Sequence, residues 1–209
     1  PHNSKGPAVF AVGMDKKLVR EMVKLFSGTL RSTGFTGDIV VAIYPGCKEG
    51  FVEMLKTTKT ITYVIDLDCT KKESTRDHQC GFMNSQPRIA VSINMIRLYM
   101  YKWWSTLYDA DAKILLSDFR DVIFQSNPFD YIPLQWSAPD YQLVVFQESF
   151  PNKMIYRCSH NKKWLVDCYG KDMFEDVAYN PVSCSGTVMG SRDGIILYVS
   201  QLFRFCCIL

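Results

Sequence analysis

The sequence contains no uninterrupted apolar run of about 20 residues, the length that a helix needs to span a bilayer. It also lacks Gly-x-Gly-x-x-Gly and Gly-x4-Gly-Lys-Ser/Thr, the glycine-rich loops of dinucleotide-binding and P-loop enzymes. The 24 Lys and Arg residues are scattered and outnumber the 21 Asp and Glu residues by only three. That excess is small for a nucleic-acid-binding protein. These absences argue against a membrane-spanning helix, the two common nucleotide loops and a nucleic-acid ligand.

The eight cysteines include no Cys-x-x-Cys pair, which argues against zinc and leaves disulfides or buried thiols. Cys158 and Cys168 flank a short loop and are the first candidates for a disulfide. The cysteine content favours the lumen of the Golgi or endoplasmic reticulum, with the cytoplasm as the alternative. His2, His78 and His160 have no metal-ligand spacing, and we expect none of them to be catalytic.

At 209 residues and 24.0 kDa, the chain has the size of one domain with a continuous core. Its 47% hydrophobic and 22% charged residues are typical of a globular protein. The chain opens on Pro1 without a Met or a signal-like segment, which we interpret as the cut end of a longer precursor.

Short apolar runs predict buried strands at residues 7–14, 38–44, 60–67, 113–117 and 141–147. Apolar residues at helical spacing predict helices at residues 15–30, 49–56, 92–108, 162–169 and 191–203. Residues 69–85 are polar without periodicity, and we expect a loop there. Alternating strands and helices predict an α/β fold with a mostly parallel central sheet and helices on both faces.

Ligands of open α/β sheets bind at the carboxyl ends of the strands. In this sequence that edge includes Val12, Gly13 and Met14 after the first strand and Leu67 after the third. A tight turn from strand to helix also explains Gly13. We therefore look for a functional site at this edge.

The fourth predicted strand runs directly into acidic residues, in the stretch 113–129 (KILLSDFRDVIFQSNPF). Asp118 and Asp121 would point to opposite faces of a straight strand, so a bend is needed for both to reach one ion. One or two carboxylates suffice to hold Mg2+ or Mn2+ when a diphosphate supplies further oxygens. The alternative is a surface turn in which Arg120 neutralises its acidic neighbours.

This stretch resembles the metal-binding motif of GT-A glycosyltransferases, in which a strand ends in Asp-x-Asp, an apolar pair, Phe and a short run to Pro-Phe. Residues 121–129 (DVIFQSNPF) match the second half of that motif. Asp121 takes the second aspartate position, Phe119 stands at the first, and Asp118 lies one residue early. The turn is also similar to that of a subgroup of nucleotide-diphospho-sugar transferases with Ser-Asp-x-Arg-Asp-Val, in which Asp118, Arg120 and Asp121 all match.

The resemblance spans residues 8–202 and implies a GT-A-like fold, a nucleotide-sugar donor and a divalent cation, Mn2+ or Mg2+. It implies that Asp118 and Asp121 are the catalytic metal ligands. Residues 182–191 (VSCSGTVMGS) are similar to the element that lets the backbone approach the donor sugar, with Ser185 and Gly186 in contact. A plain strand and turn of small residues is the alternative for this element.

The resemblance also implies donor contacts from Val12, Gly13 and Met14 to the base and ribose, and from Arg97 and Arg120 to the phosphates. A solvated arginine on a helix is the alternative for Arg97.

Glu148 follows the strand predicted at 141–147 and is placed at the same sheet edge. It is our candidate for orienting an acceptor hydroxyl or accepting its proton. The acceptor, whether glycan, protein or lipid, is not determined by the sequence.

Related enzymes continue past the final helix into an element that completes the site. The resemblance therefore implies that residues 1–209 are a single nucleotide-diphospho-sugar transferase-like domain, a fragment without an N-terminal membrane anchor and C-terminal elements. Two alternatives stay open: a non-catalytic relative that binds a nucleotide sugar or glycan, and a cytosolic α/β nucleotide-binding enzyme of another kind.

Overall fold

The computed structural model describes residues 1–13, 20–45, 47, 49–70, 79–82, 91–130 and 143–205. The strands of its main sheet are β1 (Ala8–Gly13), β2 (Asp38–Ile43), β3 (Thr60–Val64), β7 (Lys113–Ser117), β8 (Leu143–Gln147) and β9 (Ser183–Ser191). Its helical elements are α1 (Arg20–Val23), η1 (Lys24–Gly28), α2 (Thr29–Ser32), α3 (Glu49–Thr57), α4 (Ile93–Ser105), η3 (Ile155–Arg157), α5 (Ser159–Val177) and α6 (Arg192–Phe205).

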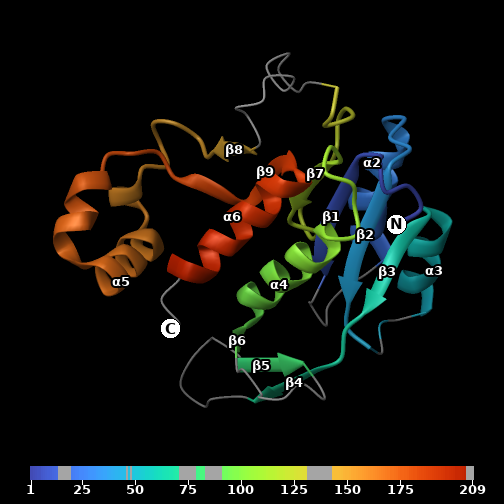
Figure 1. Ribbon diagram of the computed structural model, residues 1–209, viewed down its shortest axis with the longest axis horizontal. Coiled ribbons are helices and arrows are strands. Elements are labelled where there is room, and N and C mark those ends of the chain that lie inside the picture. Colours follow the sequence, from blue (N-terminus) through green and yellow to red (C-terminus); the bar gives the residue numbers. More distant parts are fainter. Residues whose placement is uncertain are drawn as a thin grey trace.

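The main sheet has six strands in the order β3-β2-β1-β7-β9-β8 (Figure 1). Strands β3, β2, β1 and β7 pair in parallel, and β9 is antiparallel to both of its neighbours. Consequently β8 runs in the same direction as β7, and only β9 is reversed. The predicted α/β fold with a mostly parallel central sheet is confirmed.

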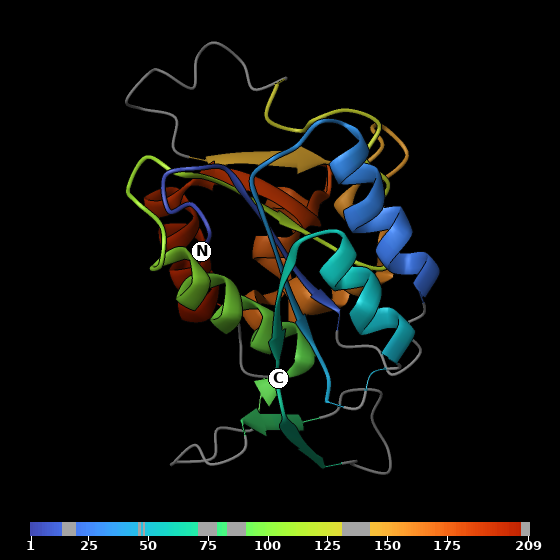
Figure 2. The ribbon, with the colours of Figure 1, turned by 90° about the vertical axis from the view of Figure 1, so that its right-hand side faces the viewer.

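Helices cover both faces of this sheet (Figure 2). On one face, Phe10 of β1 packs in a buried cluster with Trp104 of α4 and Ile195 of α6. On the other face, the cluster includes Phe26 and Leu55 from the helices that follow β1 and β2. Successive residues of a strand point to opposite faces, so a strand buried on both sides must be apolar throughout. This requirement explains the continuous apolar runs in the sequence.

Two predictions for residues 60–85 are wrong. The predicted strand 60–67 ends at Val64, and Leu67 belongs to a separate strand of another sheet. The predicted loop 69–85 contains strands where it is described, and these form a second, three-stranded antiparallel sheet: β4 (Leu67–Thr70), β5 (Gln79–Phe82) and β6 (Val91–Ser92). Strands of two to four residues are too short for alternation to be visible in the sequence.

The predicted helices differ from the observed ones mainly in their ends. The helix predicted at 15–30 is described from Arg20 to Ser32, while residues 14–19 lie outside the described residues. The helix predicted at 162–169 is part of the longer helix α5 (Ser159–Val177). This helix is kinked at Gly170, where φ is 86°. Glycine adopts this left-handed conformation without steric cost, so the chain turns there without a loop.

Cys158 and Cys168 do not form the predicted disulfide, and both side chains are thiols. Helix α5 begins at Ser159, immediately after Cys158. Ten residues of helix place the two Cα atoms roughly 15 Å apart, whereas a disulfide needs about 5.5–6 Å. A lumenal location stays a prediction. No helix in the described ranges is long and apolar enough to cross a membrane.

A buried carboxylate begins the second strand of the sheet. Asp38 is 4% exposed and accepts hydrogen bonds from the Tyr108 hydroxyl at 2.8 Å and the His2 backbone N–H at 3.0 Å. Burial, followed by the bond to Asp38, raises the pKa of the Tyr108 phenol, so the phenol remains a donor at neutral pH. This bond joins the segment after α4 to the sheet over a sequence separation of 70 residues.

We expect Tyr108→Phe to lower the free energy of unfolding by about 1–3 kcal/mol, because a buried carboxylate loses a donor. The ring itself stays packed against Phe10, whose centroid is 5.5 Å away. Urea unfolding at neutral pH measures the change. Tyr179→Phe is the matched control, since Tyr179 is 76% exposed and its loss of a hydroxyl should change stability by less than about 0.5 kcal/mol. Equal unfolding midpoints for the two variants would contradict the structural role of the Asp38 bond.

Candidate functional site

The predicted bend after β7 is present. The strand ends at Ser117, and the chain bends over residues 119–121. Phe119 is 3% exposed and its ring packs against Phe26 at 4.9 Å between centroids. The aromatic ring is thus an anchor in the core, which rules out a ligand role for the residue at the first motif position. Asp118, which precedes it, is left half-exposed at the carboxyl edge of the sheet.

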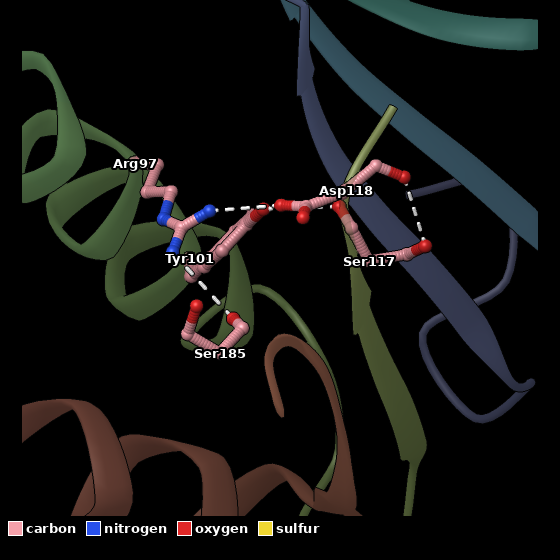
Figure 3. Close-up of polar contacts among 5 residues, drawn as sticks. All are labelled: Arg97, Tyr101, Ser117, Asp118 and Ser185. Carbon is pink, nitrogen blue, oxygen red and sulfur yellow. Dashed lines mark hydrogen bonds and ion pairs between the residues drawn. The ribbon is translucent and has the colours of Figure 1, made fainter. Parts of the chain in front are cut away.

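Asp118 makes hydrogen bonds with β9, with α4 and with its own neighbour Ser117, and Figure 3 shows those with Arg97 and Ser117. Its backbone N–H donates to the Gly186 carbonyl at 2.8 Å, and its Oδ1 accepts a hydrogen bond from Nη1 of Arg97 at 2.9 Å. The Ser117 hydroxyl donates to the Asp118 carbonyl at 2.9 Å. The side chains of Arg97 and Asp118 are 23% and 47% exposed, so both charges remain in contact with water. Helix α4 and strand β9 therefore orient one acidic side chain at the end of β7.

The start of β9 lies directly against this carboxylate. A Cβ atom on Gly186 would collide with Oδ2 of Asp118 and would lie 2.7 Å from its Cγ. Arg97 also directs Nη2 toward the Ser185 carbonyl, at 3.5 Å. Only glycine leaves room for such an approach of backbone to carboxylate. The predicted donor-sugar element at residues 182–191 is therefore mostly strand β9. Its Gly186 leaves space for the Asp118 carboxylate.

Sequence reasoning missed Tyr101 as part of this arrangement. Its hydroxyl donates to the Ser117 carbonyl at 3.3 Å, and the side chain is 4% exposed. Burial raises the pKa of the Tyr101 phenol. The positive charge of Arg97 lowers this pKa by a smaller amount, and the negative charge of Asp118 raises it slightly, so the phenol keeps its proton. The available signal was the spacing, because Tyr101 lies four residues after Arg97 and shares its helix face.

Two of the residues predicted at the end of β1 also lie at this edge. Ala11 is the partner of Ser117 in the β1–β7 register, so Val12 and Gly13 continue beside the turn that follows β7. Gly13 is buried and Val12 is half-buried. Met14 lies outside the described residues. The end of β1 is thus the immediate neighbour of Asp118.

The remaining predicted residues share the edge but are spread along it. Arg120 and Asp121 are both exposed on the bend. Glu148 is half-buried and follows β8, where its backbone N–H donates to the Val182 carbonyl at 2.9 Å. Neighbouring strands are about 4.8 Å apart, so β8 lies roughly 10 Å from β7, with β9 between them.

The polar groups at this edge, which include both hydrogen-bond acceptors and donors, suit a ligand that carries hydroxyls and phosphates. Carboxylates on Asp118 and Asp121 accept hydrogen bonds or bind a cation, and the Arg97 guanidinium donates to anionic oxygens. Within the part of the chain whose side chains are described, no group of three or more His, Cys, Asp or Glu residues gathers as a metal site. Carboxylate oxygens, such as those of Asp118, are of the ligand type that Mg2+ or Mn2+ takes when a diphosphate supplies further oxygens.

No protein-family model and no curated protein matches the sequence. Among solved structures, the chain is similar to the galactosyltransferase LgtC in complex with donor and acceptor sugar analogues, at 11% identity and a TM-score of 0.48, over 97% of this chain and 66% of that one. An active-site mutant of LgtC is 12% identical, with a TM-score of 0.48 and coverages of 97% and 65%.

A further similar structure is core-mannan synthase A (CmsA/Ktr4) from Aspergillus fumigatus in its Mn/GDP form. It is 12% identical, with a TM-score of 0.42, over 97% of this chain and 64% of that one. The chain therefore spans just under two thirds of the length of these three solved structures.

We expect Gly186→Ala to destabilise the protein by about 1–3 kcal/mol, because the new methyl group forces the Asp118 carboxylate away from Arg97. Chemical denaturation measures the change. The double variant Gly186→Ala/Asp118→Ala should recover most of the loss, since the colliding carboxylate is removed. Gly50→Ala is the matched control, because a Cβ at Gly50 meets nothing within 4 Å. Equal destabilisation by Gly186→Ala with and without Asp118 would show that the collision lies elsewhere.

Proposed function

We propose that the chain is a glycosyltransferase domain of GT-A type, which moves a sugar from a nucleotide-diphosphate donor to an acceptor hydroxyl. The observation that carries the proposal is the arrangement at the carboxyl edge of the sheet. There Asp118 is hydrogen-bonded through its carboxylate to Arg97 and through its backbone N–H to the Gly186 carbonyl, so that three different elements meet at one acidic residue. The motif in residues 118–129 supports the same assignment from the sequence.

In this proposal the diphosphate binds beside the bend after β7. Asp118 and Asp121 hold a divalent cation, Mn2+ or Mg2+, together with oxygens of the diphosphate. The cation, when bound, neutralises negative charge that develops on the departing diphosphate. Arg97 and Arg120 bind anionic phosphate oxygens, a role suited to the guanidinium fork.

The ends of two other strands supply the remaining donor contacts. Val12 and Gly13, with Met14 beyond them, contact the base and ribose at the end of β1. Ser185 and Gly186 are the proposed contacts to the donor sugar, through backbone atoms, since the side of Gly186 that lacks a side chain is filled by Asp118. These positions form one side of the proposed donor pocket.

Glu148 is the candidate residue for the acceptor. Its strand lies roughly 10 Å from β7, and Glu148 is also displaced along β9, beside Val182, whereas Asp118 lies beside Gly186. From there its carboxylate would orient the acceptor hydroxyl or accept its proton as the new glycosidic bond forms. The bond from the sugar to the diphosphate breaks, and the diphosphate leaves with the electron pair. A glycan, a protein or a lipid fits this role for the acceptor.

We expect UDP or GDP to bind only weakly without a divalent cation and at least about tenfold more tightly with Mn2+, because the cation bridges carboxylate and diphosphate. Isothermal titration calorimetry with Mn2+ and with EDTA measures the difference. Equal affinities for both nucleotides under both conditions would refute metal-assisted binding. A nucleotide-sugar hydrolysis assay on the same preparation separates the two functions, since binding without turnover indicates the non-catalytic relative.

Within the same site, we expect Asp121→Ala to weaken Mn2+-dependent nucleotide binding more than Asp118→Ala does. Asp121 occupies the second aspartate position of the motif, whereas Asp118 lies one residue before the first. Both variants should keep the wild-type melting temperature to within a few degrees, because exposed charges contribute little to stability. Superimposable titration curves for the two variants would contradict the alignment of Asp121 with the motif.

A further inference from the structure

The carboxylate proposed to bind the cation is already paired with a positive charge. Oδ1 of Asp118 accepts the hydrogen bond of Arg97 at 2.9 Å, and Oδ2 faces the backbone of Gly186. We infer that Arg97 disfavours binding of a bare cation at Asp118, so that the site takes up the cation and the nucleoside diphosphate together. This inference rests on the proposed function and concerns the form in which the site receives its ligands.

Electrostatics gives the reason for this selectivity. A divalent cation at Asp118 would lie beside the Arg97 guanidinium, and two positive charges at such a distance repel each other. It would also compete with the guanidinium for the same carboxylate. A nucleoside diphosphate removes both obstacles, because its phosphate oxygens offer Arg97 a new anionic partner of suitable geometry. Asp118 then becomes available to the cation that the diphosphate carries.

The surrounding contacts allow this exchange without a change of fold. The backbone of Asp118 is held by the Gly186 carbonyl at 2.8 Å, and the preceding carbonyl, that of Ser117, is held by the buried Tyr101 phenol at 3.3 Å. The second contact of Arg97, from Nη2 to the Ser185 carbonyl, is long at 3.5 Å and therefore weak. Rotation of the Arg97 side chain exchanges its partners, while these contacts keep the backbone of Asp118 in place.

The strength of the pair suits such a role. With side chains 23% and 47% exposed, the pair is partly screened by water. Pairs of this kind change an equilibrium by only about two- to fivefold. An ion pair of this strength is weak enough for a diphosphate to displace Arg97 from Asp118. Its effect on cation binding is still large enough to be measured.

The test uses Mn2+ alone as its probe, with free Mn2+ measured by electron paramagnetic resonance. Without nucleotide, Arg97→Gln should bind Mn2+ about two- to fivefold more tightly than the wild type, because both the competition and the repulsion are gone. With UDP or GDP present, the wild type should gain more Mn2+ affinity than Arg97→Gln does. Arg97→Lys keeps the charge and should resemble the wild type. Lys56→Gln, which removes an exposed charge at the opposite edge of the sheet, should leave Mn2+ binding unchanged.

Asp118→Asn makes the result specific to this pair. In that background, adding Arg97→Gln should change Mn2+ affinity much less than it does alone, as a double-mutant cycle requires of two interacting residues. Unchanged or weaker Mn2+ binding by Arg97→Gln, or an equal gain from Lys56→Gln, would overturn the inference. If neither UDP nor GDP promotes Mn2+ binding in any variant, the proposed function fails. The nucleotide-free comparison still decides the role of Arg97 in that case.

Discussion

The candidate site depends on the ion pair between Arg97 and Asp118, which joins helix α4 to the end of β7 at 2.9 Å. An ion pair exposed to this degree contributes only about 0–1 kcal/mol to stability. Its effect is therefore on orientation: it fixes where the carboxylate points and presents a guanidinium beside it. The chemistry proposed for this edge requires both groups at the same place.

The pair is positioned by the two cores on either side of the sheet. On one face, α4 is packed through Trp104 and Tyr101, which directs Arg97 toward the carboxyl edge of β7. On the other face, Phe119 is inserted between Phe26 and Phe51, which holds the bend. Asp118 lies between these two anchors, so its place follows from packing on both faces of β7. Substitutions in either core should move the site even though they do not touch it.

The reversed strand β9 adds the third contact and defines the width of the edge. Because it runs against β7, its first residues, not its last, meet the bend, which brings Gly186 against Asp118. It also separates β7 from β8 and so separates Asp118 from Glu148. The separation of these two carboxylates thus arises from one antiparallel strand within an otherwise parallel sheet.

Sequence patterns were sufficient for the α/β class, the extent of β7 and the acidic bend at its end, because burial on both faces demands continuous apolar runs. They did not reveal that Arg97 pairs with Asp118 or that Tyr101 supports Ser117, since these contacts join segments 21 and 16 residues apart. The direction of β9 and the short second sheet also emerged only from the packed fold. Local patterns record whether a residue is buried, whereas the partners of a half-exposed carboxylate depend on how all the elements pack together and have no local signature.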